Sequence, residues 1–365
     1  MNDQKRKVTV VDIARVAGVA LGTVSRVLNN HPEVNDEMRN RVLETARDLN
    51  YTRIRKRRAT TRTPSGEANG AASGNIAVIC FGMEDALVHL PVVSSALQGI
   101  EHALASQHRD LMFANVPDGD RVPAFLRHGR VDGLILKGPN QGRLPVSHES
   151  ELLRHIYQFP RVWLMGRLPN AQGDHCNFDF ETAARLVAEH LAGQGHRHVA
   201  FFNPKPGQVQ FERLKMAFFG VAPQHRLQAT LLETEPPARL AWPLPAITLE
   251  SHVEELVERW TNIPAQDRPT TLFTPSDRTA VQVYASLARR GLKVGQDVSV
   301  VSCNNERSLA TSLHPALTTI DVHPDQIGRR AIDLLLWRIA HAEDPHQLQI
   351  FVDPTLVVRE SVAPI

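Results

Sequence analysis

The chain has 365 residues, of which 42% are hydrophobic, so it is long enough for two or three domains with sizeable buried cores, which argues against wholesale disorder. No apolar run approaches the roughly 20 residues that a membrane span needs, and residues 8–16 are interrupted by polar side chains, so neither a membrane anchor nor an export signal is expected. The three cysteines lie far apart without metal-ligand or redox spacing, which indicates buried thiols in a reducing cytoplasm: Cys80, Cys176 and Cys303.

Residues 1–62 form a basic head on an acidic body. The head holds 14 Lys and Arg against 7 Asp and Glu, a net charge of +7, whereas residues 63–365 hold 27 against 32, a net charge of −5. This asymmetry indicates a phosphate-rich partner for the head alone. The alternative is a solvated basic tail, so the motifs within the head decide between the two.

Three short helices are predicted in the first fifty residues. Thr9 can cap the first helix, Asp12 completes a capping box, and Gly18 ends the helix where a left-handed residue is needed. A second helix is expected over residues 21–29, and Asn35 is expected to cap a third. The apolar residues expected to face inward are Val24, Val27 and Leu28 in the second helix and Val42, Leu43, Ala46 and Leu49 in the third. Such a trio is typical of a helix-turn-helix, whose second helix enters the major groove.

The run VTVVDIARVAGVALGTVSRVLNN at residues 8–30, with V-N-x-x-x-R at 34–39 and L-N-Y at 49–51, resembles the head of the LacI/GalR repressor family. The resemblance implies double-stranded operator DNA as a partner, with Leu21 and Gly22 at base-reading positions. It places Arg26 at a base or phosphate contact, where the guanidinium could bind guanine with about 1–3 kcal/mol of discrimination. Ala20 replaces the family's Ser or Thr cap, so a backbone-only start is expected. The expected DNA-binding residues are Thr9, Leu21, Gly22, Thr23, Ser25, Arg26, Asn29, Asn35, Arg39, Tyr51, Arg55, Arg57 and Arg58.

The segment after the head departs from the family pattern. Family members show a proline and a short helix whose leucine wedges into the minor groove, whereas this chain has TRIRKRRATTR at residues 52–62, without proline and with Thr60 near the leucine position. Arginines suit a narrow minor groove, but threonine cannot unstack a base step. Residues 63–74 are small, polar and Gly-rich, typical of a flexible tether. Residues 1–51 are therefore expected to be the DNA-binding domain and 52–74 a basic hinge and linker.

The body, residues 75–365, alternates short apolar runs with amphipathic stretches. Buried strands are predicted at 76–81, 110–116, 132–138, 161–166, 198–202, 270–274 and 298–302, and helices at 92–106, 181–194 and 278–290. This rhythm predicts an α/β fold of parallel sheets in two lobes. The motifs VDGLI at 131–135, GHRHV at 195–199, HPALTTI at 314–320 and VRES at 358–361 resemble the family's periplasmic-binding-protein-like core. The lobes are expected at about 75–173 plus 307–338 and 174–306 plus 339–365.

The resemblance places an effector in the cleft between the lobes. The implied effector-binding residues are Leu90, Val92, Phe178, Arg213, Trp242, Ser276 and Asn304. Lys215 is an alternative to Arg213, and Trp242 could equally be a packing residue. The family has Asp where this chain has Asn304, and loss of that charge favours recognition through neutral hydrogen bonds. A sugar or sugar acid is the favoured effector, with a nucleobase the less favoured alternative.

Catalytic interpretations find no support in the sequence. G-x-S-x-G, P-loop and G-x-G-x-x-G motifs do not occur, so no enzyme and no cofactor are expected. His196 and His198 form an H-x-H without further ligands, which favours surface histidines over a metal site. A solute-binding protein of the same core would need an export signal and no basic head, and a nicotinamide-dependent enzyme would need a glycine fingerprint. A homodimer is expected, with the helix over 325–340 as its interface through Ile327, Ala331, Leu334 and Leu335.

Overall fold

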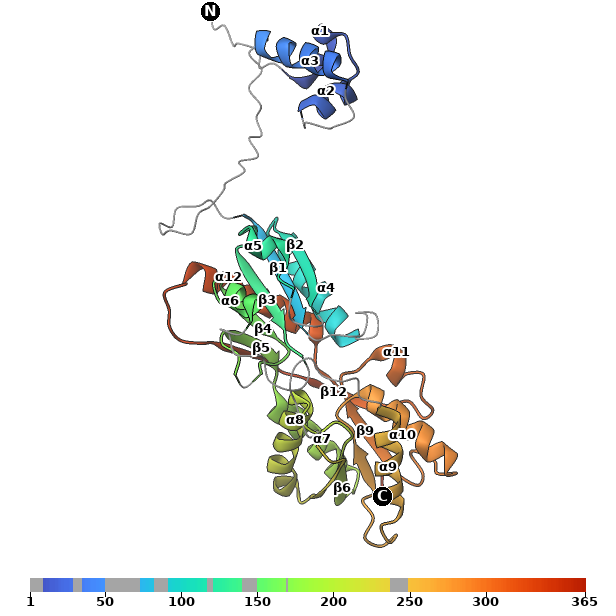
Figure 1. Ribbon diagram of the computed structural model, residues 1–365. Helices are drawn as coiled ribbons and strands as arrows, with labels where there is room; N and C mark the ends of the chain where they lie inside the picture. The colour runs from blue at the N-terminus through green and yellow to red at the C-terminus, as the bar shows by residue number, and fades with distance from the viewer. Residues whose placement is uncertain are drawn as a thin grey trace, which may run out of the picture. The chain divides into compact units, whose positions relative to one another are not determined.

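The computed structural model describes residues 9–28, 35–49, 73–81, 91–116, 121–139, 150–168, 170–236 and 249–365. The chain divides into two units, Met1–Asn69 and Gly70–Ile365. The first unit is the helical head, and the second is the α/β body (Figure 1).

The head consists of α1 (Val10–Ala17), α2 (Leu21–Leu28) and α3 (Asp36–Asp48). Thr9 caps α1 through a complete capping box with Asp12, and Gly18 adopts the left-handed conformation at φ 66°, so both predictions are confirmed. Asn35 caps α3 by accepting from the backbone N–H of Glu37. The core of the head is Ile13, Ala17, Val24, Val27, Val42 and Ala46, with Ala14, Val19 and Leu49 packed against it.

Leu43 is not part of the core of the head. Its prediction as a buried residue is wrong, because 37% of its surface is exposed. Val42 and Ala46, four residues apart on α3, take the core-facing positions instead. Leu43 lies about 100° around the helix from Val42, which turns it toward solvent.

The body contains two six-stranded sheets, which confirms the predicted two-lobed α/β fold. The order of the first sheet is β11-β5-β4-β3-β1-β2, and all its strand pairs are parallel. Its strands are β1 (Asn75–Phe81), β2 (Asp110–Val116), β3 (Gly133–Lys137), β4 (Arg161–Leu164), β5 (Asp174–Phe178) and β11 (Gln349–Val352). Helices α4 (Pro91–Ala105) and α12 (Pro324–Ala340) supply one face of its core, and α5 (Ala124–Arg127) and α6 (Glu151–Ile156) the other.

The second sheet has the order β12-β10-β9-β8-β6-β7, and only the pair of β10 with β12 is antiparallel among its pairs. Its strands are β6 (His198–Asn203), β7 (Gln228–Glu233), β8 (Thr271–Phe273), β9 (Ser299–Cys303), β10 (Thr318–Asp321) and β12 (Thr355–Val357). Its helices are α7 (Phe180–Gly193), α8 (Val209–Val221), α9 (Leu249–Thr261), α10 (Asp277–Arg289) and α11 (Arg307–Ala310), with the 3₁₀ helix η2 (Ala222–His225). The face of the second sheet that α7 and α8 cover shares a continuous hydrophobic core with the first lobe.

The chain crosses between the lobes three times, at residues 178–180, 321–324 and 352–355. The crossing segments are tied to one another, because the backbone N–H of Asp179 donates to the carbonyl of Val352 at 3.1 Å and the His323 Nε2 lies 3.0 Å from the hydroxyl of Thr355. The red C-terminal segment that ends in β12 can be followed from one lobe to the other in Figure 1. These three segments form the hinge of the body.

The predicted lobe boundaries fall too early in the chain at every crossing. Each crossing follows a strand that the sequence analysis did not predict, namely β5, β10 and β11. Polar residues obscure β5, where Asp174, His175 and Asn177 are all buried. Strand β2 was predicted to be buried, but it lies at an edge of the first sheet and 42% of the Phe113 surface is exposed.

Helices α4 and α12 cross closely, and two glycines allow the contact. A Cβ on Gly99 would collide with the backbone of Asp325, and one on Gly328 would collide with the carbonyl of Ala96. The apolar stripe predicted to be the dimer interface faces inward here: Ile327, Ala331, Leu334 and Leu335 are buried within the protomer. That prediction is therefore wrong, because the stripe completes the core of the first lobe.

Replacement of Gly328 by alanine tests this crossing. The added methyl group meets backbone atoms that cannot rotate away, so we expect the free energy of unfolding to fall by about 1–3 kcal/mol. Gly220→Ala is the matched control, because that helical glycine has no atom within 4 Å of its Cβ position. The control should be neutral or gain up to about 1 kcal/mol from helix propensity. Urea unfolding of both variants measures the difference, and equal effects would contradict the close crossing.

Candidate functional site

The helix expected to read DNA begins without a side-chain cap. The N–H groups of Thr23 and Val24 donate to the carbonyl of Ala20 at 2.9 and 3.3 Å, as expected for a backbone-only start. Gly22 is exposed on α2, and Thr23 is partly buried. No heavy atom lies within 4 Å of the position that a Gly22 Cβ would occupy, so this face of α2 leaves room for a close approach.

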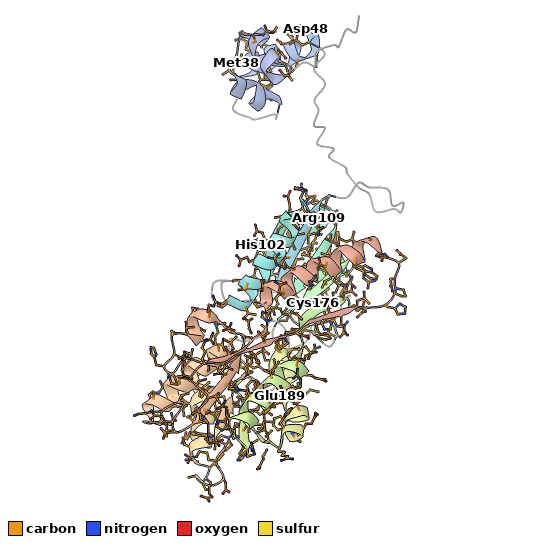
Figure 2. All side chains as sticks on the ribbon, turned by 180° about the vertical axis from the view of Figure 1, so that it is seen from behind. Met38, Asp48, His102, Arg109, Cys176 and Glu189 are labelled. Atoms are coloured by element: carbon orange, nitrogen blue, oxygen red, sulfur yellow. The ribbon has the colours of Figure 1, made fainter. Side chains whose placement is uncertain are left out.

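Of the other predicted DNA-binding residues, three have described side chains: Thr9, Asn35 and Arg39. Thr9 and Asn35 hold the first turns of α1 and α3, and Arg39 is partly buried on α3. Met38, labelled in Figure 2, is 45% exposed on the same helix. Leu21, Ser25 and Arg26 lie on α2, but their side chains are outside the described residues. Asn29, Tyr51, Arg55, Arg57 and Arg58 are outside the described residues entirely.

Asp132 fixes the chain where it enters the body. Its carboxylate accepts from the backbone N–H groups of Ser73 at 2.6 Å and Gly74 at 3.0 Å and from the guanidinium of Arg109 at 3.2 Å. Burial alone would raise the pKa of Asp132, but these hydrogen bonds outweigh it and lower the pKa. Figure 2 shows Arg109 at this end of the first lobe.

Two predicted effector residues lie near an aromatic pair at the first crossing. The Phe178 ring is buried, with its centroid 4.2 Å from that of Phe180. The Arg213 guanidinium lies over the Phe180 ring at 6.0 Å from its centroid. Burial and then the neighbouring Arg167 lower the pKa of Arg213. The structure thus groups Phe178 and Arg213 around Phe180.

Lys215 has a different environment from Arg213. Its ammonium group pairs with the carboxylates of Glu212 at 2.7 Å and Glu233 at 2.9 Å. Burial would lower the pKa of Lys215, but the two carboxylates raise it. Lys215 therefore already has two acidic partners, whereas no ion pair of Arg213 is found among the described residues.

Ser276 and Asn304 lie beside a buried polar network of the second lobe. Ser276 caps α10 by accepting from the N–H of Thr279 at 3.3 Å, and the neighbouring Asp277 carboxylate accepts from the Glu306 N–H at 2.5 Å. Burial raises the pKa of Asp277 to about 7, although hydrogen bonds oppose the shift. Asn304 has a positive φ of 119°, and its backbone N–H donates to the carbonyl of Ile320 at 2.8 Å. Both residues therefore have structural partners within the lobe.

Of the remaining predicted effector residues, Val92 is the one that the structure describes. Val92 lies on α4, partly buried against the core of the first lobe. Leu90 and Trp242 are outside the described residues. Within the described residues, no hydrogen bond joins Phe178, Phe180 or Arg213 to Ser276 or Asn304.

A pocket that the sequence analysis missed lies between the lobes. It is lined by Lys137, Pro139, Met165, Gly166, Arg167, Leu168, Val209 and Gln210. Gln210, on α8, spans the gap: its amide nitrogen donates to the carbonyl of Met165, and its amide oxygen accepts from Asn177 at 3.3 Å. Lys137, at the end of the otherwise apolar segment 133–137, was the available signal in the sequence.

The histidines and cysteines have structural roles. His196 is 1% exposed, not on the surface as predicted, and its ring nitrogens lie within hydrogen-bond distance of the Thr270 hydroxyl and the Ala363 carbonyl. His198 contacts the hydroxyl of Thr230. Cys80, Cys176 and Cys303 are free and buried, as predicted. In the described part of the chain no group of three His, Cys, Asp or Glu could hold a metal ion, and no helix is long and apolar enough to cross a membrane.

Known families match both units. Residues 9–53 match the family described as bacterial regulatory proteins, lacI family, and residues 188–362 match the periplasmic binding protein-like domain. The chain is 26% identical to the transcriptional repressor PurR of Mannheimia succiniciproducens over 98% of this chain and 99% of that protein. It is also 26% identical to the ribose operon repressor of Haemophilus influenzae over 97% of this chain and 98% of that one.

Solved structures share the fold. A transcriptional regulator CelR–cellobiose complex superposes with a TM-score of 0.61 at 20% identity, covering 97% of this chain and all of that one. The lac repressor dimer bound to operator and an anti-inducer gives a TM-score of 0.62 at 20% identity, covering 98% of this chain and all of that one. At these identities the likeness establishes the architecture of the chain and not its ligand.

Removal of the Thr9 hydroxyl tests the capping box. Thr9→Ala removes the acceptor for the Asp12 N–H and the 2.7 Å donor to its carboxylate, so α1 should lose about 1 kcal/mol of stability. Amide hydrogen exchange in α1 of the full chain should then become about fivefold faster. Thr45→Ala is the control, because Thr45 bonds only to the carbonyl of Arg41 within α3. Unchanged exchange in α1 would count against the cap.

Proposed function

The chain belongs to the lacI family of bacterial regulatory proteins, and from that premise we propose that it is a sequence-specific DNA-binding repressor whose operator affinity a small molecule controls. The carrying observation is that one chain joins a lacI-family helix-turn-helix to a two-lobed periplasmic-binding-protein-like body over nearly the whole length of known repressors. Because it acts on DNA, we place it in the cytoplasm.

Helix α2 is proposed to lie in the major groove. Its apolar residues Val24 and Val27 are buried in the head, while Gly22 is exposed on its first turn. Arg26, on the same helix, is proposed to read a base edge. The arginines at 55, 57 and 58 are proposed to add phosphate and minor-groove contacts that carry no base specificity.

The effector is proposed to be a sugar or sugar derivative bound between the lobes. The ribose operon repressor and the CelR–cellobiose complex support this class, since each is named for a sugar. Arg213 is the proposed hydrogen-bond donor to it, because its guanidinium has five donors and lies at the first crossing between the lobes.

A homodimer is proposed, because one head reads too few bases for specificity and two heads reach half-sites about 34–36 Å apart. The lac repressor structure, which is a dimer on its operator, supports this assembly. The apolar stripe of α12 is not available as the interface, since it is buried in each protomer.

The two alternatives account for less of the chain. A solute-binding protein would share the body but has no use for a lacI-family head. A nicotinamide-dependent enzyme would need a glycine-rich phosphate loop after a strand, which the sequence lacks. Titration with duplex DNA at several salt concentrations separates these classes from a repressor.

Two sets of substitutions should affect DNA binding differently. Arg26→Ala should reduce discrimination between operator and random DNA by about 1–3 kcal/mol, because a base contact is lost. Arg57→Gln combined with Arg58→Gln should weaken binding to both DNAs and flatten the log–log salt slope by about one unit per lost phosphate contact. Fluorescence anisotropy with both duplexes measures these effects. If Arg26→Ala weakened both equally, the assignment of Arg26 to base reading would be wrong.

Arg213 should be required for the effector response but not for operator binding. Operator affinity would be measured with and without a panel of sugars and sugar acids, for the natural protein and for Arg213→Ala. We expect the variant to bind the operator normally, because the head is a separate unit, and to lose the response. Lys215→Ala serves as the comparison, since its ammonium group is held by Glu212 and Glu233. A full response in Arg213→Ala and a lost response in Lys215→Ala would reverse the assignment.

A further inference from the structure

The body holds the end of the linker through hydrogen bonds around Asp132. The Asp132 carboxylate accepts from the backbone N–H groups of Ser73 at 2.6 Å and Gly74 at 3.0 Å. Gly74 is fixed a second time through its carbonyl, which accepts from the N–H of Asp110 at 3.2 Å. The next residue, Asn75, begins β1. Residues 73 and 74 are therefore fastened to the body before the first strand begins.

The Asp132 carboxylate is itself held in one position. Asp132 directly precedes β3, and its own N–H donates to the carbonyl of Asn75 at 2.9 Å. The Asn75 side-chain amide donates in turn to the carbonyl of Arg130 at 2.9 Å. The Arg109 guanidinium donates to the carboxylate at 3.2 Å, and only 12% of the Asp132 side chain is exposed. The acceptor for the linker thus has a fixed place at the amino end of the first sheet.

The backbone turns at the residue that Asp132 holds. Gly74 has a φ of 77°, in the left-handed region that favours glycine, and no heavy atom lies within 4 Å of its Cβ position. Glycine is therefore needed here for the direction of the backbone and not for space. The hydrogen bonds from Ser73 and Gly74 fix this turn, so they determine the direction in which the chain leaves the body as well as the point.

Little else in the described residues holds Ser73 and Gly74. The Ser73 hydroxyl accepts only from the N–H of Asn75 at 3.2 Å, two residues further along the chain, and Gly74 retains the single bond from Asp110. Loss of the Asp132 carboxylate would therefore allow both residues to leave the surface. Two released residues add up to about 7 Å to the reach of each chain. That length corresponds to about two base pairs along a DNA duplex.

We propose that Asp132 is a positioning residue for operator recognition: by fastening Ser73 and Gly74 it limits the spacing between half-sites that the dimer accepts. This role rests on the proposed function, in which a homodimer presents two heads to one operator. A linker that ends at a fixed point gives the second head a high effective concentration at one spacing and a lower one at others. Release of the last two linker residues lowers that maximum and broadens the range of spacings.

The test varies the distance between the half-sites. A palindromic duplex is selected by the full chain from a randomised pool, and versions with one or two additional central base pairs are compared with it and with a single half-site by fluorescence anisotropy. Two additional base pairs should weaken binding by the natural protein about tenfold or more, and by Asp132→Ala less than about threefold. Asp132→Ala should bind the selected duplex more weakly and the half-site normally, because the head is a separate unit.

The control and the rescue separate positioning from general stability. Asp297→Ala is the matched control, because the Asp297 carboxylate accepts from the N–H of Lys293 at 2.8 Å in a loop of the second lobe. It should retain the natural dependence on spacing. Deletion of residues 71–72 from Asp132→Ala removes the length that was released, so it should restore the preference for the selected spacing. A loss of stability would not be corrected by a shorter linker.

Ser73→Pro keeps the test decisive if Asp132→Ala does not fold. It removes one of the two bonded N–H groups at an exposed residue and leaves Asp132 in place, so it should broaden the accepted spacings in the same direction.

The positioning role is overturned if the natural protein binds all spacings equally, or if Asp132→Ala, or Ser73→Pro in its place, shows the same dependence on spacing as Asp297→Ala. Failure of the deletion to restore the preference overturns it as well. Binding to the half-site with unchanged spacing dependence in the variants contradicts only the role of Asp132. If the full chain selects no duplex and binds no half-site, the proposed function fails together with this role.

Discussion

The hinge is the constraint on which the arrangement of the body depends. The chain crosses between the lobes at residues 178–180, 321–324 and 352–355, and contacts of Asp179 with Val352 and of His323 with Thr355 hold the crossings together. Three crossing segments that are bonded to one another restrict the lobes to rotation about the hinge more strongly than a single linker would. A ligand between the lobes can then shift the body only through a difference in its affinity for the closed and open arrangements. Gln210, which spans the gap from α8 to Met165 and Asn177, belongs to the contacts that such a rotation would change.

The hinge also determines which movements of the body can reach the head. The linker joins the body at Ser73 and Gly74, both held by Asp132, and the chain then enters β1 within the first sheet. Any movement of the first lobe therefore moves the point at which the head is attached. The close packing of α4 on α12 through Gly99 and Gly328 keeps this lobe rigid enough to move as one piece. In a dimer, such a movement would change the distance between the two points at which the linkers join the bodies.

Local signals in the sequence were sufficient for the head and for much of the sheets. Thr9, Gly18 and Asn35 act on neighbouring backbone, so their roles follow from short-range chemistry alone. Strands made of consecutive apolar residues, such as β1 and β3, were also predictable, because both of their faces are buried. Strand β5 was missed because Asp174, His175 and Asn177 are polar, and their burial depends on partners as distant as Arg338. The lobe boundaries were wrong for the same reason, since each follows a strand with a mixed pattern.

The pocket illustrates a further limit on what a sequence can reveal. Lys137, Arg167 and Arg213 are widely separated along the chain, and each alone resembles an ordinary surface cation. Their significance comes from two long-range facts: the strand order places β3 beside β4, and the first crossing brings α8 against the end of that sheet. The family resemblance indicated Arg213 but did not indicate its charged neighbours, because resemblance transfers positions and not the electrostatic field that they share. The composition of the pocket is therefore a property of the assembled edge, which the strand order and the first crossing determine together.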